Sequence, residues 1–152
     1  MHSFSKAYGM AGNRIGYLVG PAEAVAAARK VSTHTFYAAP TAGQLAALRA
    51  LREGESWLAR ARALCCEAGY AAADALGVAR PEGSTFLFLD VRHRLDERGV
   101  WGFLSDCVAE GVALAPGPSC GEAYDGWVRL CYTAAPPDVV RRAVEVVARR
   151  LR

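Results

Sequence analysis

Long apolar runs, paired cysteines and lysine are all scarce in this sequence of 152 residues. No apolar run reaches the roughly 20 residues that a membrane-spanning helix needs, and the polar N-terminus does not match a secretory signal. The five cysteines are an odd number and include no Cys-x-x-Cys pair. This pattern argues against a disulfide framework or a zinc site, and it favours a reducing cytoplasm. We therefore expect a cytoplasmic chain with no membrane segment and no metal.

Lysine is rare although basic residues are common. Of the 18 basic residues, only Lys6 and Lys30 are lysines, and the others are arginines. An arginine side chain stays protonated and does not readily form a Schiff base, whereas a lysine amine does. Where a lysine occurs in a chain that otherwise uses arginine, it is a candidate for chemistry that needs an amine. We attribute the presence of a lysine at position 30 to chance and assign no chemical role to Lys30.

The composition also limits the class of partner. The formal net charge is only +3, which does not indicate a nucleic-acid or anionic-membrane partner. Hydrophobic residues make up 53% of the chain, enough for a packed core. Arginines near the C-terminus are expected to complement the dipole of the last helix rather than to bind nucleic acid.

The apolar pattern predicts helices alternating with short strands. Strands are expected over 14–19, 85–91, 112–115 and 127–132, and helices over 21–31, 41–76, 100–110 and from 136 onward. The long helix is expected to bend or break near Gly54 and to stop at Gly77. Residues 1–13 and 32–40 are predicted as irregular connections. We expect Phe86, Phe88, Trp101 and Phe103 in the core. The predicted fold class is α/β, with an α+β layer after residue 41.

Residues 3–16 hold the densest set of chemical groups in the chain. They include two hydroxyls, an amine, several glycines and Arg14. Arginine and serine donors suit a phosphate dianion, and glycines allow turns that other residues avoid. The spacing matches neither the Walker A motif nor the dinucleotide-binding fingerprint. A phosphate site next to an amine suggests a cofactor that carries both a phosphate and an aldehyde, although most loops of this kind are only turns.

The pattern S-x-S-K-x-x-G-x-x-G-x-R-x-G-Y-x-x-G-P over residues 3–21 resembles the cofactor-lysine segment of class I/II aminotransferases of fold type I, similar to aspartate aminotransferase. Three later segments resemble the same family in the same order. They are residues 34–44 (HTFYAAPTAGQ), 81–90 (PEGSTFLFLD) and 115–134 (APGPSCGEAYDGWVRLCYTA). The resemblance covers essentially the whole chain.

The resemblance implies a role for each matching residue. Lys6 would hold pyridoxal 5'-phosphate as an imine and then act as the base that moves a proton. Ser3 and Arg14 would bind the phosphate, and Ser5 matches the motif at a cofactor-binding position. Arg129 would bind the α-carboxylate of the substrate, a task that suits the arginine fork. The implied substrates are an amino acid and a 2-oxo acid, and the implied complete enzyme is a homodimer.

The resemblance also implies a domain organisation. Residues 1–42 would be a remnant of the cofactor-binding large domain, and residues 43–152 would form the interdomain helix and the C-terminal small domain. In this family, the residues that contact the cofactor ring lie upstream of the lysine. Here the lysine is the sixth residue. Cys120 stands where an aromatic residue is common, and Asn13 stands where a bulky one is common.

Three other possibilities stay open from the sequence. The chain could be a truncated remnant without catalysis, or one chain of a split enzyme. A lyase or synthase of the same fold would also carry the lysine segment.

Overall fold

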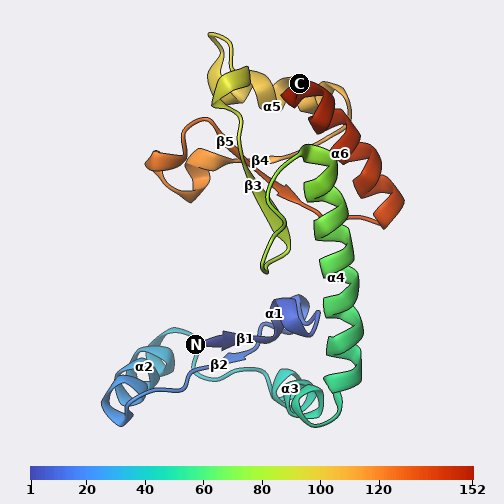
Figure 1. The fold of residues 1–152 in the computed structure, drawn as a ribbon. Helices are drawn as coiled ribbons and strands as arrows, with labels where there is room; N and C mark the ends of the chain where they lie inside the picture. The colour runs from blue at the N-terminus through green and yellow to red at the C-terminus, as the bar shows by residue number, and fades with distance from the viewer. The chain divides into compact units, whose positions relative to one another are not determined.

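The computed structural model describes residues 1–152, which divide into two compact units, Met1–Arg62 and Ala63–Arg152 (Figure 1). Each unit has a hydrophobic cluster of its own. No helix combines the length and the apolar character needed to cross a membrane. The predicted division into residues 1–42 and 43–152 concerns the domains of a whole aminotransferase, and it stays a prediction.

The first unit contains two short strands and several helices. These elements are β1 (His2–Ser3), α1 (Phe4–Ala7), η1 (Ala11–Asn13), β2 (Gly16–Tyr17), α2 (Ala22–Thr35), α3 (Thr41–Glu53) and the start of α4 (Glu55–Leu76). β1 and β2 pair antiparallel. The prediction that residues 1–13 form only an irregular connection is therefore wrong, and the predicted strand over 14–19 is shorter than expected.

A small buried cluster organises the N-terminal segment. Phe4, Ile15 and Ala47 are buried together, and the Phe4 amide donates to the Ile15 carbonyl oxygen at 3.3 Å. A Cβ on Gly16 would lie 2.7 Å from the carbonyl oxygen of His2. Because that distance is below van der Waals contact, only glycine lets the two strands approach this closely.

Two helices of this unit begin directly after prolines, and one of them ends later than expected. Pro21 and Pro40 are the N-cap residues of α2 and α3. α2 continues to Thr35, where hydroxyl groups bond to carbonyls one turn back, for example Thr33 Oγ1 to the Arg29 carbonyl oxygen at 2.8 Å. These local hydrogen bonds satisfy the hydroxyl groups of the residues after 31. The sequence pattern had placed those residues in an irregular connection. The predicted break near Gly54 is confirmed, since α3 ends at Glu53 and α4 begins at Glu55.

The second unit is a layer of helices on one antiparallel sheet. It contains the end of α4, β3 (Phe86–Asp90), η2 (Arg92–Arg94), α5 (Gly99–Ala109), β4 (Ala115–Pro116), η3 (Gly117–Cys120), η4 (Glu122–Tyr124), β5 (Trp127–Cys131) and α6 (Pro137–Leu151). The sheet has three strands in the order β3-β5-β4. The predicted strand over 112–115 is misplaced, because the Val112 amide instead donates to the Cys107 carbonyl and closes the end of α5.

Only one face of this sheet is covered by helices. Leu87, Leu89, Val128 and Leu130 are buried and join a cluster with residues of α4, α5 and α6, the helices that lie on one side of the sheet (Figure 1). Side chains alternate along a strand, so the residues between them occupy the open face.

The prediction of four core aromatic residues is wrong for two of them, which are exposed. Phe86 lies on the open face of the sheet and is 38% exposed, while Trp101 on α5 is 63% exposed. Phe88 is half-buried, and Phe103 is buried as predicted. Val144 and Val147 of α6 are also in the core.

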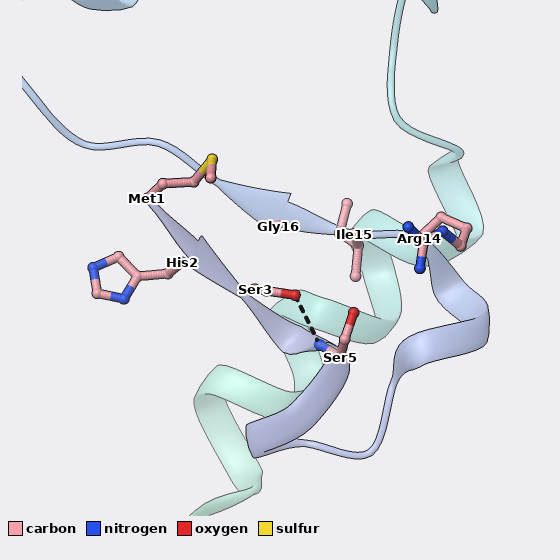
Figure 2. A pocket seen from close by; sticks show the side chains of 7 residues that line it. All are labelled: Met1, His2, Ser3, Ser5, Arg14, Ile15 and Gly16. Atoms are coloured by element: carbon pink, nitrogen blue, oxygen red, sulfur yellow. Dashed lines mark hydrogen bonds between the residues drawn. The ribbon is translucent and has the colours of Figure 1, made fainter. Parts of the chain in front are cut away.

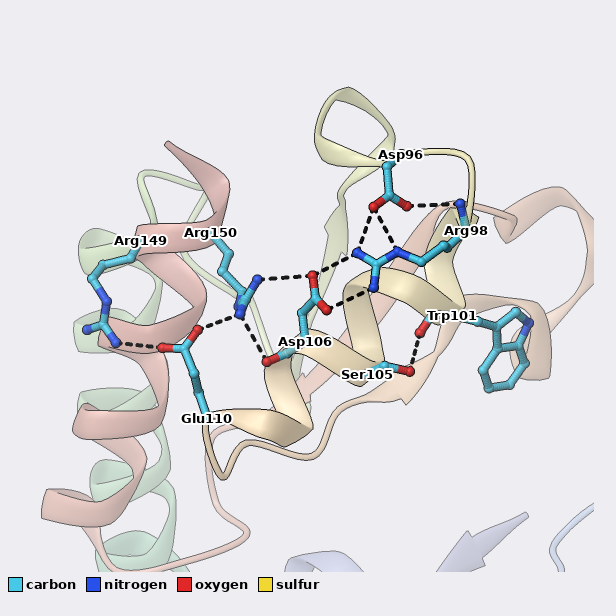
Figure 3. Close-up of polar contacts among 8 residues, drawn as sticks. All are labelled: Asp96, Arg98, Trp101, Ser105, Asp106, Glu110, Arg149 and Arg150. Carbon is cyan, nitrogen blue, oxygen red and sulfur yellow. Dashed lines mark hydrogen bonds and ion pairs between the residues drawn. The ribbon is translucent and has the colours of Figure 1, made fainter.

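Charged side chains connect α5 to α6 at the surface (Figure 3). Within α5, Asp106 accepts two hydrogen bonds from Arg98, the N-cap residue of that helix, each of 3.0 Å. Between the helices, Glu110 at the end of α5 accepts from Arg149 of α6 at 3.0 Å and pairs with Arg150 at 2.6 Å. Hydrogen bonds from Arg98 lower the pKa of Asp106, and those from Arg149 lower the pKa of Glu110. Exposed pairs contribute little singly, so the network serves mainly to fix how the two helices meet.

Candidate functional site

The lysine segment of the first unit borders a pocket. The cavity has a volume of about 350 Å³, and it is lined by Met1, His2, Ser3, Ser5, Arg14, Ile15 and Gly16 (Figure 2). Three of the four residues predicted to bind the cofactor, Ser3, Ser5 and Arg14, are therefore brought together. No acidic side chain is in the lining, so the charge of the pocket suits an anion.

The two serines present hydroxyl groups at the turn from β1 into α1. Ser3 Oγ accepts a hydrogen bond from the Ser5 amide at 3.1 Å and caps α1. This bond uses an oxygen lone pair of Ser3 and leaves its O–H free to donate. The Ser5 hydroxyl has no hydrogen-bond partner within the chain and lies on the pocket side of the turn (Figure 2).

Arg14 has a backbone conformation that is uncommon for a residue with a side chain. Its φ of 49° and ψ of 49° lie in the left-handed region, which usually costs on the order of 1–3 kcal/mol outside glycine. Its Nη1 donates to the Ala11 carbonyl at 3.0 Å. That bond holds the guanidinium group near the loop, and the remaining N–H donors are free for an anion in the pocket.

Lys6 lies on α1 directly after Ser5, and its side chain is exposed. It does not line the pocket, and no hydrogen bond or ion pair engages its amine. The fourth residue predicted to bind the cofactor is thus adjacent in sequence to the pocket lining without being part of it.

Arg129 belongs to the second unit and lies on the central strand of the sheet. It faces Phe88 of β3 on one side and Ala115 of β4 on the other. Arg129 alternates with the buried residues Val128 and Leu130 and is itself half-buried, so its side chain lies on the open face of the sheet. No hydrogen bond or ion pair engages its guanidinium group, whose carbon lies 5.1 Å from the centre of the Phe86 ring.

The segment before β5 is packed too tightly for a side chain at Gly117. A Cβ there would lie 2.3 Å from the Tyr124 carbonyl oxygen and 2.5 Å from that of Trp127. We expect Gly117→Ala to lower the free energy of unfolding by about 1–3 kcal/mol, since the backbone before Arg129 has to move. Gly83→Ala is the matched control, because nothing lies within 4 Å of a Cβ at Gly83. Denaturant unfolding of both variants checks this expectation, and equal stability of the two contradicts it.

Asp90, at the end of β3, is held ionised by its neighbour. Its carboxylate accepts from Arg92 Nε at 2.9 Å and from the Arg92 amide at 3.1 Å. These side-chain and backbone hydrogen bonds lower the pKa of Asp90 from 3.8 to about 2.

This shift predicts an acid dependence of stability with a definite sign. The pKa of Asp90 is lower in the folded chain than in the unfolded chain. Asp90 therefore contributes fully to stability at a pH above the ordinary pKa of its carboxyl, and this contribution is lost as the pH falls through about 2. An NMR titration of the Asp90 carboxyl carbon should show a midpoint of about 2. In Arg92→Gln the midpoint should return toward the ordinary value. An unchanged midpoint in that variant contradicts the assignment to Arg92.

Two features of the site were missed from the sequence. His2 lines the pocket because β1 pairs with β2 and places it opposite Tyr17; no pattern in the sequence indicates this pairing of two-residue strands. Phe86 lies under Arg129 rather than in the core. Its alternation with Leu87 could have indicated the open face once one side of β3 was known to be covered.

Known proteins resemble the chain over almost its full length. The family model for class I and II aminotransferases matches residues 1–147. An LL-diaminopimelate aminotransferase of Dehalococcoides mccartyi is 28% identical over 152 residues, which cover 97% of this chain and 38% of the relative. The aspartate aminotransferase of Thermotoga maritima is 30% identical over 137 residues, which cover 89% of this chain and 35% of the relative.

The fold agrees with these matches. The crystal structure of an aromatic aminotransferase from Pyrococcus horikoshii superimposes with a TM-score of 0.85 at 26% identity, covering 96% of this chain and 40% of that one. The chain thus spans less than half the length of the relatives that it matches. By its family model and its fold, which is the α/β fold type I, the chain belongs to the class I and II aminotransferases.

Proposed function

We propose that this chain supplies the lysine and the phosphate-binding segment of an enzyme that moves an amino group from an amino acid to a 2-oxo acid. The observation that carries the proposal is the pocket that gathers Ser3, Ser5 and Arg14, of which Ser5 directly precedes Lys6 in the sequence. The chain covers 38% of the Dehalococcoides relative. The proposal therefore concerns the complete enzyme. By this we mean this chain together with a segment equivalent to the part of such a relative that this chain does not cover. The two parts can belong to one polypeptide or to two.

The residues present fit pyridoxal 5'-phosphate, the cofactor on which this family depends. Two hydroxyl groups and one guanidinium group border a cavity without acids, which is a donor set that a phosphate dianion needs. The exposed amine of Lys6 follows Ser5 in the sequence. When bound, the cofactor supplies an aldehyde that takes up amino groups and a ring that accepts electrons.

Each residue has a separate task in this proposal. Arg14 and Ser3 bind the phosphate, Ser5 assists them, and Lys6 attaches the cofactor covalently. The amine of Lys6 would also act as the base that takes the proton from the α-carbon of the substrate. Arg129 binds the α-carboxylate through its planar fork of N–H donors.

The proposal includes the domain organisation and the assembly. We assign residues 1–42 to the cofactor-binding large domain, and residues 43–152 to the interdomain helix and the small domain. The family's usual assembly supports a homodimer for the complete enzyme. Aspartate, aromatic amino acids and LL-diaminopimelate are named for relatives of this chain, and they are the first substrates to test.

The direct test is the appearance of a 2-oxo acid product. We expect the complete enzyme with pyridoxal 5'-phosphate to convert an amino acid from this set into its 2-oxo acid when 2-oxoglutarate is present. The 152-residue chain alone is expected to show no steady turnover, because a site loosened by about 1 Å loses on the order of 100-fold in rate. If the complete enzyme binds the cofactor but catalyses elimination or decarboxylation of these amino acids, it is a lyase and not an aminotransferase.

A further inference from the structure

The surroundings of Arg129 differ from those of the other arginines that lie over aromatic rings. Arg80 lies over Tyr70 at 5.2 Å and Arg92 over Trp127 at 6.0 Å. Each of these two also pairs with a carboxylate, Asp74 for the first and Asp90 for the second. Arg129 lies over Phe86 at 5.1 Å and has no acid partner. The guanidinium carbon of Arg129 therefore lies over a ring while its N–H groups make no bond to the protein.

We infer that Phe86 is a positioning residue for Arg129, holding the guanidinium plane so that its N–H edge meets the substrate carboxylate. This inference rests on the proposed function, in which Arg129 binds that carboxylate. Phe86 does not touch the carboxylate itself and acts only through Arg129.

The strand register explains how the contact arises. Phe86 pairs with Cys131, and Arg129 pairs with Phe88, in the antiparallel ladder of β3 and β5. Phe86 is thus the diagonal neighbour of Arg129 on the open face, a separation that aromatic and long side chains span. The side chain of Phe86 has only two rotatable bonds, so it presents a well-defined surface to the guanidinium group.

A ring is better suited to this position than an acid. A carboxylate beside Arg129 would occupy the same N–H groups that the substrate needs and would repel the substrate's charge. A ring face attracts the cation by its quadrupole and leaves the hydrogen-bonding edge free. Asp90 is the acid on the same face of β3, but it is bonded to Arg92, which keeps its charge away from the arginine that we assign to the substrate.

The test uses the 152-residue chain and NMR of the Arg129 Nε–H group, with 2-oxoglutarate as the carboxylate probe. We expect a ring-current shift of the Nε–H resonance that is lost in Phe86→Leu and kept in Phe86→Tyr. The Kd for the probe, read from the same resonance, should rise about two- to fivefold in Phe86→Leu. It should stay near the parent value in Phe86→Tyr, which retains the ring. A merely structural role for Phe86 would not produce this pair of results.

Arg129→Gln separates failure of the inference from failure of the proposed function. For this variant, binding is followed through the amide signals of β5. If Arg129→Gln weakens binding while Phe86→Leu leaves both the Kd and the Nε–H shift unchanged, the positioning role is overturned and the proposed function stands. If Arg129→Gln binds the probe as tightly as the parent, or the parent Arg129 resonance does not respond to the probe, the carboxylate role of Arg129 fails. If Phe86→Leu loses the dispersed signals of a folded chain, Phe86→Met is measured in its place, and equal values for Phe86→Met and the parent overturn the inference.

Discussion

Replacing Lys6 by alanine should abolish transamination by the complete enzyme. The amine is assigned both to covalent attachment of the cofactor and to proton transfer, and a positioned acid–base group alone contributes about 10²–10⁴-fold in rate. Lys6→Arg should be as inactive as Lys6→Ala, because it keeps the positive charge and loses the nucleophilic amine. The measurement is kcat for an amino acid and a 2-oxo acid, with the enzyme saturated by cofactor.

Lys30 provides the internal control for this result. It lies on α2 and is exposed, and it is the only other lysine in the chain. Lys30→Arg should retain the parent kcat. Substantial turnover by Lys6→Ala, or loss of turnover in Lys30→Arg, would contradict the assignment of the amine to Lys6.

Replacing Arg129 by alanine should weaken amino acid substrates and spare amines that lack a carboxylate. Loss of a charged hydrogen-bond partner costs about 2–5 kcal/mol, which corresponds to about 30- to 5,000-fold in kcat/KM. Because Arg129 is half-buried and has no protein partner for its N–H groups, no internal ion pair is lost in the variant. The measurement compares kcat/KM for an amino acid with the rate for the corresponding amine.

Arg141→Ala is the matched control for Arg129→Ala. Arg141 is exposed on α6 and makes no hydrogen bond or ion pair. The control removes the same charge from the same unit and should leave both rates unchanged. Equal losses for the amino acid and the amine in Arg129→Ala would mean that Arg129 has a structural role.

Where the sequence pattern continued over a whole helix, the prediction of the fold succeeded. The break at Gly54 and the stop at Gly77 are both confirmed, since α4 lies between them and Gly77 has a φ of +68°. Glycine adopts this conformation without the clash that a Cβ causes. The last helix, predicted from 136 onward, is also confirmed, since α6 covers Pro137–Leu151.

Short elements and exposed faces were harder to predict, for physical reasons. β1 and β2 have two residues each, and their pairing depends on a close backbone approach at Gly16 that no periodic pattern records. The core prediction failed at Phe86 because a strand with apolar residues on both faces does not indicate which face the helices cover.

The candidate site was predictable only in part. The motif placed Ser3, Ser5 and Arg14 close in sequence, and the structure brings them to one cavity. It could not have indicated the left-handed backbone of Arg14, which follows from the turn between η1 and β2. Nor could it have indicated that Arg129 has a ring and no acid beside it, since that contact depends on the register of β3 against β5.

The most direct test of the central claim is to locate the cofactor on the chain. The complete enzyme is loaded with pyridoxal 5'-phosphate, reduced with borohydride, digested and mapped by mass spectrometry. We predict that the reduced cofactor is attached to the peptide that contains Lys6 and that Lys6→Arg carries none. Attachment to Lys30, or no attachment to either lysine of this chain, would contradict the claim that Lys6 is the cofactor-binding residue.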